Sequence, residues 1–152
     1  MDKKFYKINK AIHTRNYVFN THYHLVWVTK YRNKAFFTPS VVNNMEKILR
    51  YVAKKDKITI EKMEVMPDHV HLMLLFRPSL SISNVVKQLK GNSARLFLYK
   101  YPQLKKSQFW DGHLWSHSYY VGTVGDMSKK TVERYIANQY IDHRKKKSHF
   151  RG

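Results

Sequence analysis

The 152-residue chain has no cysteine and few acidic residues. Without cysteine it can form neither disulfides nor thiolate metal sites. Asp and Glu together number 10, against 29 Lys and Arg, which gives a formal net charge of +19. A surface with so large an excess of positive charge attracts polyanions, and nucleic acid is the leading candidate among them.

Long apolar runs are also lacking. No stretch approaches the roughly 20 apolar residues that a membrane-spanning helix needs, and no lipidation signal stands out. The N-terminal stretch MDKKFYKINK carries charge but is not followed by the apolar segment of a signal peptide. These absences predict a cytoplasmic protein that is not attached to a membrane.

Aromatic residues, in contrast, make up 14% of the chain. Unpaired bases stack on aromatic rings while Lys and Arg hold the phosphates, so this composition suits single-stranded nucleic acid, although most of the rings are expected in the core. The length and the 43% of hydrophobic residues predict one domain over residues 1–152. Residues 1–16 form a basic lead and residues 144–152 a basic tail.

Hydrophobic periodicity predicts the order β, α, β, β, α, β, α. Strands are expected in residues 17–30, 58–66, 69–76 and 113–125. Helices are expected from Thr38 or Ser40, from Ser81 or Ser83 with Gly91 as a possible interruption and Pro102 as the end, and from Ser128. This order predicts an α+β fold, a mostly antiparallel sheet with packed helices, related to the ferredoxin-like plait.

Two pairs of histidines stand in predicted strands. In VMPDHVHLMLLF, His69 and His71 follow a Pro-Asp turn and are two residues apart, so both project from one face of the strand. Two neutral imidazoles on one face can bind a divalent ion, or they can simply form hydrogen bonds on a half-exposed face. His22 and His24 have the same spacing, so the spacing by itself does not decide which pair binds an ion.

The last predicted helix adds a phenol and an amide. In TVERYIANQY, Tyr135 and Gln139 are four residues apart and therefore lie on one helical face. A helix docked near a histidine pair would present both groups to the same ion. The alternative is an ordinary amphipathic stripe, which Tyr135 fits well and Gln139 fits poorly.

Five stretches, taken together, resemble one family. HLVWVTKYR, MPDHVHLML, SISNVVKQLKGNSAR, LWSHSYYVGTVG and VERYIANQ occur in this order over residues 17 to 139. They resemble the HUH nucleases (His, hydrophobic, His), and among these the single-tyrosine transposases of the insertion-sequence-two-hundred type.

The resemblance implies a site and a reaction. It implies that His69, His71 and Gln139 bind a divalent metal, Mg or Mn, and that Tyr135 is the nucleophile that forms a 5′-phosphotyrosine. It also implies a single-stranded DNA substrate folded into hairpins at the element ends, and a homodimer whose active sites combine the histidines of one subunit with the tyrosine helix of the other. No nucleotide cofactor is expected.

The basic residues expected to contact DNA are Lys87, Lys90, Arg95, Arg144, Lys145, Lys146 and Lys147. Two alternatives remain open at this point. The chain could be another HUH enzyme, a REP-associated tyrosine transposase or a plasmid replication initiator, or it could be a non-catalytic module that binds single-stranded nucleic acid.

Overall fold

A four-stranded antiparallel sheet forms the centre of the protein. The computed structural model describes residues 12–13, 18–19, 22–109, 111–123 and 128–150, and only the backbone of 12–13, 18–19 and 140–150. The strands are β3 (His22–Val28), β4 (Thr59–Met66), β5 (His69–Leu75) and β6 (Tyr120–Thr123), in the order β4-β5-β3-β6. The Pro-Asp turn joins β4 to β5, as the sequence predicts, and the predicted α+β class is confirmed.

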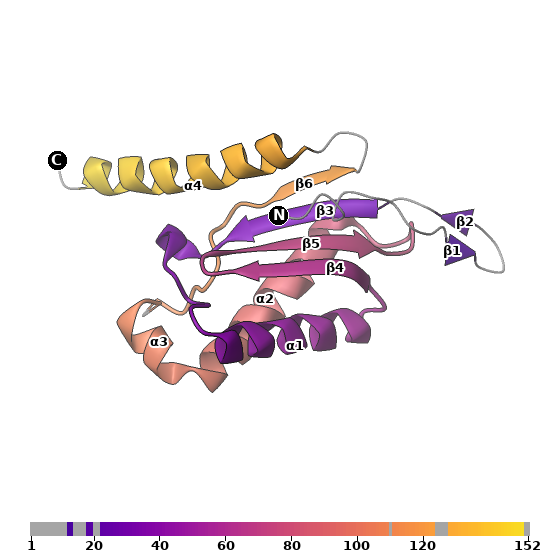
Figure 1. Ribbon diagram of the computed structural model, residues 1–152, viewed down its shortest axis with the longest axis horizontal. Coiled ribbons are helices and arrows are strands. Elements are labelled where there is room, and N and C mark those ends of the chain that lie inside the picture. The colour runs from indigo at the N-terminus through magenta and orange to yellow at the C-terminus, as the bar shows by residue number, and fades with distance from the viewer. Residues whose placement is uncertain (1–11, 14–17, 20–21, 110, 124–127, 151–152) are drawn as a thin grey trace.

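Helices cover both faces of this sheet (Figure 1). The helices α1 (Pro39–Lys55) and α2 (Ile82–Lys100) pack on one face, and α4 (Lys129–Phe150) lies along the other. Side-chain oxygens of Thr38, Ser81 and Ser128 accept hydrogen bonds from backbone N–H groups in the first turns of α1, α2 and α4. These caps satisfy donors that a helix start otherwise leaves unpaired, so three of the predicted helix starts are confirmed. No helix among the described residues is long and apolar enough to span a membrane.

Several elements differ from the prediction. The described part of the range 17–30, where one strand was expected, contains the short strand β2 (Val18–Phe19) and β3, and β2 pairs with a further short strand, β1 (Ile12–His13). Within the described residues 113–123 of the strand expected in 113–125, only β6 is a strand, and residues 124–125 lie outside the described residues. A 3-10 turn, η2 (Lys30–Arg32), and a helix, α3 (Pro102–Ser107), were not predicted. The helix α4 continues into the basic tail as far as Phe150.

Proline and glycine explain two of these differences. Pro102 ends α2 but also occupies the first turn of α3, where a missing N–H costs nothing. Gly91 does not interrupt α2, because the helix contains nineteen residues and buries an apolar stripe along most of its length. Tertiary packing of that stripe outweighs the low helix propensity of one glycine.

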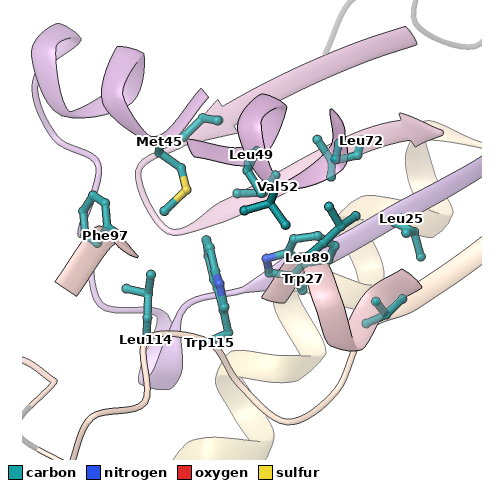
Figure 2. Packing of buried hydrophobic residues seen from close by; sticks show 14 of the residues in the cluster. Leu25, Trp27, Met45, Leu49, Val52, Leu72, Leu89, Phe97, Leu114 and Trp115 are labelled. Carbon is teal, nitrogen blue, oxygen red and sulfur yellow. The ribbon is translucent and has the colours of Figure 1, made fainter. Parts of the chain in front are cut away.

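The strands separate two apolar clusters, because successive side chains point to opposite faces. The larger cluster lies between the sheet and the helices α1 and α2 (Figure 2). Trp27 of β3 is fully buried there and meets the Trp115 ring edge-on, with the ring centroids 5.8 Å apart. The smaller cluster is on the other face and consists of Val26, Val28, Val132 and Ile136. It attaches α4 to the sheet.

Replacing Gly91 by alanine should stabilise the protein. A Cβ at this position would meet no atom within 4 Å, so the larger residue causes no clash. Alanine in the interior of a helix is favoured over glycine by about 1 kcal/mol. We therefore expect Gly91→Ala to raise the free energy of unfolding by about 0.5–1 kcal/mol, measured by urea denaturation. A decrease would show that Gly91 has a structural role in α2.

Candidate active site

The predicted catalytic residues gather on the face of the sheet that α4 covers. In the register of β3 against β5, Val26 pairs with His71 and Val28 with His69. Paired residues of antiparallel strands project from the same face, so both histidines stand beside the valines that pack against α4. His71 and Tyr135 are 64 residues apart in the sequence. In the fold, His71 lies on β5, and the helix that carries Tyr135 packs on the neighbouring strand, β3.

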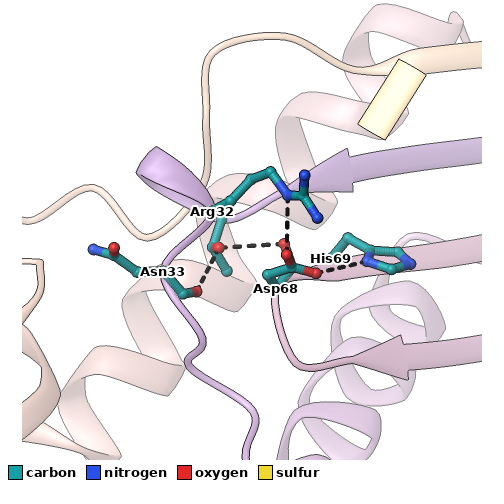
Figure 3. Close-up of polar contacts among 5 residues, drawn as sticks. Arg32, Asn33, Asp68 and His69 are labelled. Carbon is teal, nitrogen blue, oxygen red and sulfur yellow. Dashed lines mark hydrogen bonds and ion pairs between the residues drawn. The ribbon is translucent and has the colours of Figure 1, made fainter. Parts of the chain in front are cut away.

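His69 is held by a carboxylate. Its Nδ1 lies 2.9 Å from Oδ1 of Asp68, and the Nε of Arg32 donates to Oδ2 of the same carboxylate at 3.0 Å (Figure 3). Burial alone would raise the pKa of Asp68, but the hydrogen bonds from His69 and Arg32 outweigh burial and lower it. An ionised Asp68 accepts the Nδ1–H of His69, which leaves the lone pair on Nε2 for an ion.

The turn that carries Asp68 is fixed by residues that follow β3. The backbone N–H of Thr29 donates to the Asp68 carbonyl at 2.9 Å, and the N–H of Phe36 donates to the Pro67 carbonyl at 3.1 Å. Tyr31 and Arg32 adopt left-handed backbone angles, with φ of 58° and 53°. For residues other than glycine this costs on the order of 1–2 kcal/mol each. The strained turn directs Arg32 to the carboxylate that orients His69.

His71 is held by a second histidine. It is fully buried, and its Nε2 lies 3.1 Å from Nδ1 of His24, which is also fully buried. Burial, followed by the nearby His24 and His69, lowers the pKa of His71 to about 3. Burial, followed by Lys62 and His22, lowers the pKa of His24 to about 4. Both rings are therefore neutral at pH 7.

The other predicted histidine pair proves to have a different role. His22 and His24 lie on the same face of β3, but His22 Nδ1 is 3.0 Å from a carboxylate oxygen of Glu61, at the far end of the strand from His69. Spacing alone left the two pairs equivalent. The strand pairing places His24 beside His71 on the neighbouring strand, where the two rings are in contact. No signal in the sequence indicated this contact.

The residues present fit a divalent ion. Asp68 fixes the tautomer of His69 that presents Nε2. His71 lies two residues further along the same strand face and is a neutral imidazole in contact with His24. Neutral imidazoles bind metals without first losing a proton. The described residues include no group of three His, Cys, Asp or Glu placed to bind an ion. The predicted site contains only two residues of these four types, because its third ligand is Gln139.

Tyr135 and Gln139 meet at one serine, Ser118, between Trp115 and β6. The Ser118 Oγ lies 2.9 Å from the Tyr135 hydroxyl and donates to Oε1 of Gln139 at 2.5 Å. Since the serine proton goes to Gln139, Tyr135 is the donor to Ser118. The predicted pairing of Tyr135 with Gln139 on one face of α4 is therefore present, but both groups are engaged by Ser118. Sequence analysis did not single out this serine.

Burial raises the pKa of Tyr135, and the hydrogen bond to Ser118 partly opposes that effect. The ring is half-buried and packs against Tyr120 of β6, with the ring centroids 5.7 Å apart. The phenol is therefore protonated at neutral pH, and it is a weak nucleophile until its proton is removed or its target is activated.

The predicted DNA-contacting residues fall into two groups. Lys87 and Arg95 are exposed on α2, whereas Lys90 is half-buried and donates to the carbonyls of Ser116 at 2.6 Å and Ser118 at 3.1 Å. Burial lowers the pKa of Lys90 to about 8. The second group lies outside the described side chains: Arg144, Lys145, Lys146 and Lys147.

Comparison with known proteins identifies the family. Residues 17–139 match the family described as "Transposase IS200 like". The chain belongs to this family. It is 41% identical over 126 residues to the ISDra2 transposase TnpA of Deinococcus radiodurans, which covers 83% of this chain and 89% of that relative. It is 32% identical over 127 residues to the transposase for insertion sequence element IS200 of Salmonella typhimurium, covering 84% and 80%.

Solved structures of transposases share the fold. A crystal structure of a transposase from Deinococcus radiodurans superposes with a TM-score of 0.78 at 40% identity, over 85% of this chain and 98% of that one. A REP-associated tyrosine transposase bound to a REP hairpin gives a TM-score of 0.50 at 14% identity, over 90% and 74%. The resemblance to single-tyrosine HUH transposases is confirmed, and this IS200-like transposase has the fold expected for a DNA-cleaving and strand-transferring enzyme.

The two buried histidines should make the metal-free protein less stable in mild acid. In the unfolded chain they titrate near pH 6.5, but in the folded protein near 4 for His24 and 3 for His71. The unfolded state therefore binds protons first as pH falls below about 6.5, and the free energy of unfolding decreases from there toward about pH 4. Urea denaturation between about pH 7 and pH 5 measures this dependence.

The control for this experiment is the exposed pair His113 and His117. Replacing both by glutamine should leave the pH dependence of unfolding unchanged, whereas His24→Gln should flatten it. A wild-type protein with equal stability at about pH 7 and pH 5 would contradict the burial of uncharged rings.

Proposed function

We propose that this transposase cleaves and rejoins single-stranded DNA at insertion-sequence ends through a covalent bond between Tyr135 and a 5′ phosphate. The observation that carries the proposal is the placement of Tyr135 and Gln139 on the helix that packs beside His69 and His71. Identity to IS200-like transposases is 41% and 32%, against 14% for the REP-associated enzyme, which favours the insertion-sequence reaction over the REP-associated one.

The proposed reaction needs no external energy source, and each bond formed is matched by a bond broken. The Tyr135 oxygen attacks the scissile phosphorus, the bond from phosphorus to the 3′ oxygen breaks, and the phenol proton is lost as the 3′ oxygen gains one. The products are a 5′-phosphotyrosine and a free 3′-OH. Because the covalent bond conserves the phosphodiester energy, a second 3′-OH can reverse the step on another strand, without a nucleotide cofactor.

His69, His71 and Gln139 would bind a divalent ion, Mg or Mn. When bound, such an ion neutralises charge on the scissile phosphate and stabilises the leaving oxygen. Asp68 contacts His69 and His24 contacts His71, so both rings are held in place before an ion binds. The Ser118 hydroxyl accepts a hydrogen bond from Tyr135 and donates one to the Gln139 oxygen, which keeps a second lone pair for an ion. Ser118 thus stabilises a resting arrangement of the helix.

The substrate and assembly follow from the same family. We infer that the DNA is folded into hairpins near the element ends, since the REP-associated neighbour is bound to a REP hairpin. We also infer one catalytic domain over residues 1–152 and a homodimer whose sites share residues between subunits. We further infer that the reaction takes place in the cytoplasm of a prokaryotic cell, at its DNA. Lys87, Arg95 and the tail residues Arg144 to Lys147 are candidates for phosphate contacts.

Tyr135→Phe should abolish covalent attachment to DNA without affecting folding or binding. Phenylalanine keeps the ring that packs against Tyr120 and removes only the nucleophilic oxygen. Incubation with a labelled single-stranded element end and Mg or Mn, followed by denaturing electrophoresis, should show a protein–DNA adduct for the wild type and none for the variant. We expect cleavage to fall at least about 1,000-fold, as is usual when the nucleophile of a covalent mechanism is lost.

Tyr120→Phe is the matched control, because it removes a hydroxyl from the neighbouring ring. That variant should still form the adduct. An adduct that persists in Tyr135→Phe would assign the nucleophile to another tyrosine. Cleavage by the wild type without any adduct would indicate metal-activated hydrolysis instead.

Mixing two inactive proteins tests whether the active sites are shared. Tyr135→Phe lacks the nucleophile, and the double variant His69→Ala, His71→Ala lacks the metal ligands. If one site draws on both chains, a mixed dimer contains one intact site, and random exchange should restore about a quarter of wild-type cleavage. If the helix α4 serves its own chain, the mixture stays inactive. Each variant alone is the control.

A further inference from the structure

A groove of about 720 Å³ lies between α2 and a wall formed by Lys105, residues 112–117 and Tyr119. The helix α2 packs on the face of the sheet opposite to that of Tyr135. Its volume is that of a small-molecule binding pocket, which suits a nucleotide and is far too small for a duplex. None of the described lining residues is acidic. Four basic side chains and two histidines line the groove: Lys87, Lys90, Arg95, Lys105, His113 and His117. The charge of the groove therefore favours an anionic ligand.

Gly91 lies on the α2 wall of this groove. Glycine in the interior of a helix costs about 1 kcal/mol relative to alanine, and it normally permits either an unusual backbone angle or close packing. Neither reason applies here, because Gly91 lies within regular helix and a Cβ would meet nothing within 4 Å. The space that a side chain would fill belongs to the groove. Glycine keeps the helix backbone open to a ligand.

Aromatic rings at the groove suit bases. Tyr99 is 88% exposed although it is a large aromatic residue, and it lines the groove near the end of α2. On the opposite wall the rings of His113 and His117 are 5.9 Å apart and both are exposed. Bases of unpaired DNA stack on such rings independently of sequence, and neighbouring basic side chains hold the phosphates.

The groove shares a wall with the candidate active site. His117 and Tyr119 line the groove, whereas Ser118 between them is not among the lining residues and bonds to Tyr135. Lys90 joins the two walls, since its ammonium donates to the carbonyls of Ser116 and Ser118. Residues 116–118 therefore lie between the groove and Tyr135.

We propose that this groove binds unpaired nucleotides of the DNA substrate and leads the strand past residues 116–118 toward Tyr135. The inference rests on the proposed function for the identity of the strand. Lys87, Arg95 and Lys105 hold phosphates, Tyr99 and His117 contact bases, and Gly91 lets the strand approach the helix.

The binding test uses fluorescence anisotropy with a labelled oligodeoxythymidine of about 15 residues, which forms no hairpin and requires no cleavage. Gly91→Leu should place a side chain in the groove at the α2 wall and weaken binding at least about tenfold, the loss of roughly one base contact. Gln88→Leu places the same side chain on an exposed part of α2 outside the groove and should change binding less than about twofold.

A second pair of variants separates the groove from general electrostatics. Lys87→Gln with Arg95→Gln removes two charges from the groove, and Lys47→Gln with Arg50→Gln removes two exposed charges from α1. The groove variant should reduce the log-log salt slope of binding by about 1.4, or 0.7 for each lost phosphate contact, and the α1 variant should leave it unchanged. Equal effects of the two variants overturn the proposal, as does a wild type that does not bind the oligonucleotide.

Photocrosslinking of the wild-type protein to 5-iododeoxyuridine in the same oligonucleotide avoids any concern about folding of variants. Peptide mapping should place the crosslinks on Tyr99 or His117, and crosslinks confined to other surfaces overturn the assignment. Equal competition by a duplex of the same length would overturn the preference for unpaired DNA. None of these measurements uses Tyr135, so a failure of the cleavage chemistry is distinguishable from a failure of the groove.

Discussion

The register between β3 and β5 is the constraint on which the candidate active site depends. It places Val26 beside His71 and Val28 beside His69, and those valines are the apolar contact for α4. A slip of one residue would direct both histidines toward α1 and α2 and expose the apolar side chains that now form the core. The free energy of burying residues such as Trp27 and Leu72 therefore also fixes the positions of His69 and His71.

A set of supporting contacts surrounds the two histidines. Asp68 is held by Arg32 and orients His69, while His24 meets His71 from the neighbouring strand. The strained backbone at Tyr31 and Arg32 belongs to the same arrangement, since stored strain persists only where surrounding contacts determine the geometry. Rings held in this way lose little conformational freedom when an ion binds, which favours binding.

Ser118 and Lys90 connect parts of the protein that lie on opposite faces of the sheet. Lys90 extends from α2 to the carbonyls of residues 116 and 118, and Ser118 contacts Tyr135 and Gln139 of α4. Residues 116–118 therefore contribute both to the wall of the basic groove and to the contacts of α4.

The sequence by itself determined the order of the four sheet strands and of α1, α2 and α4, and the shared faces of His69 with His71 and of Tyr135 with Gln139. It indicated Ser128 as the cap of α4 and limited the caps of α1 and α2 to two residues each. These features follow from local periodicity and capping chemistry, which act over a few residues. Only the tertiary structure decided that His24 contacts His71, that Ser118 bonds to Tyr135 and Gln139, and that Lys90 donates to two carbonyls. Each of these contacts joins residues at least 17 apart in the chain, and sheet register and helix packing, which bring such residues together, have no local signature.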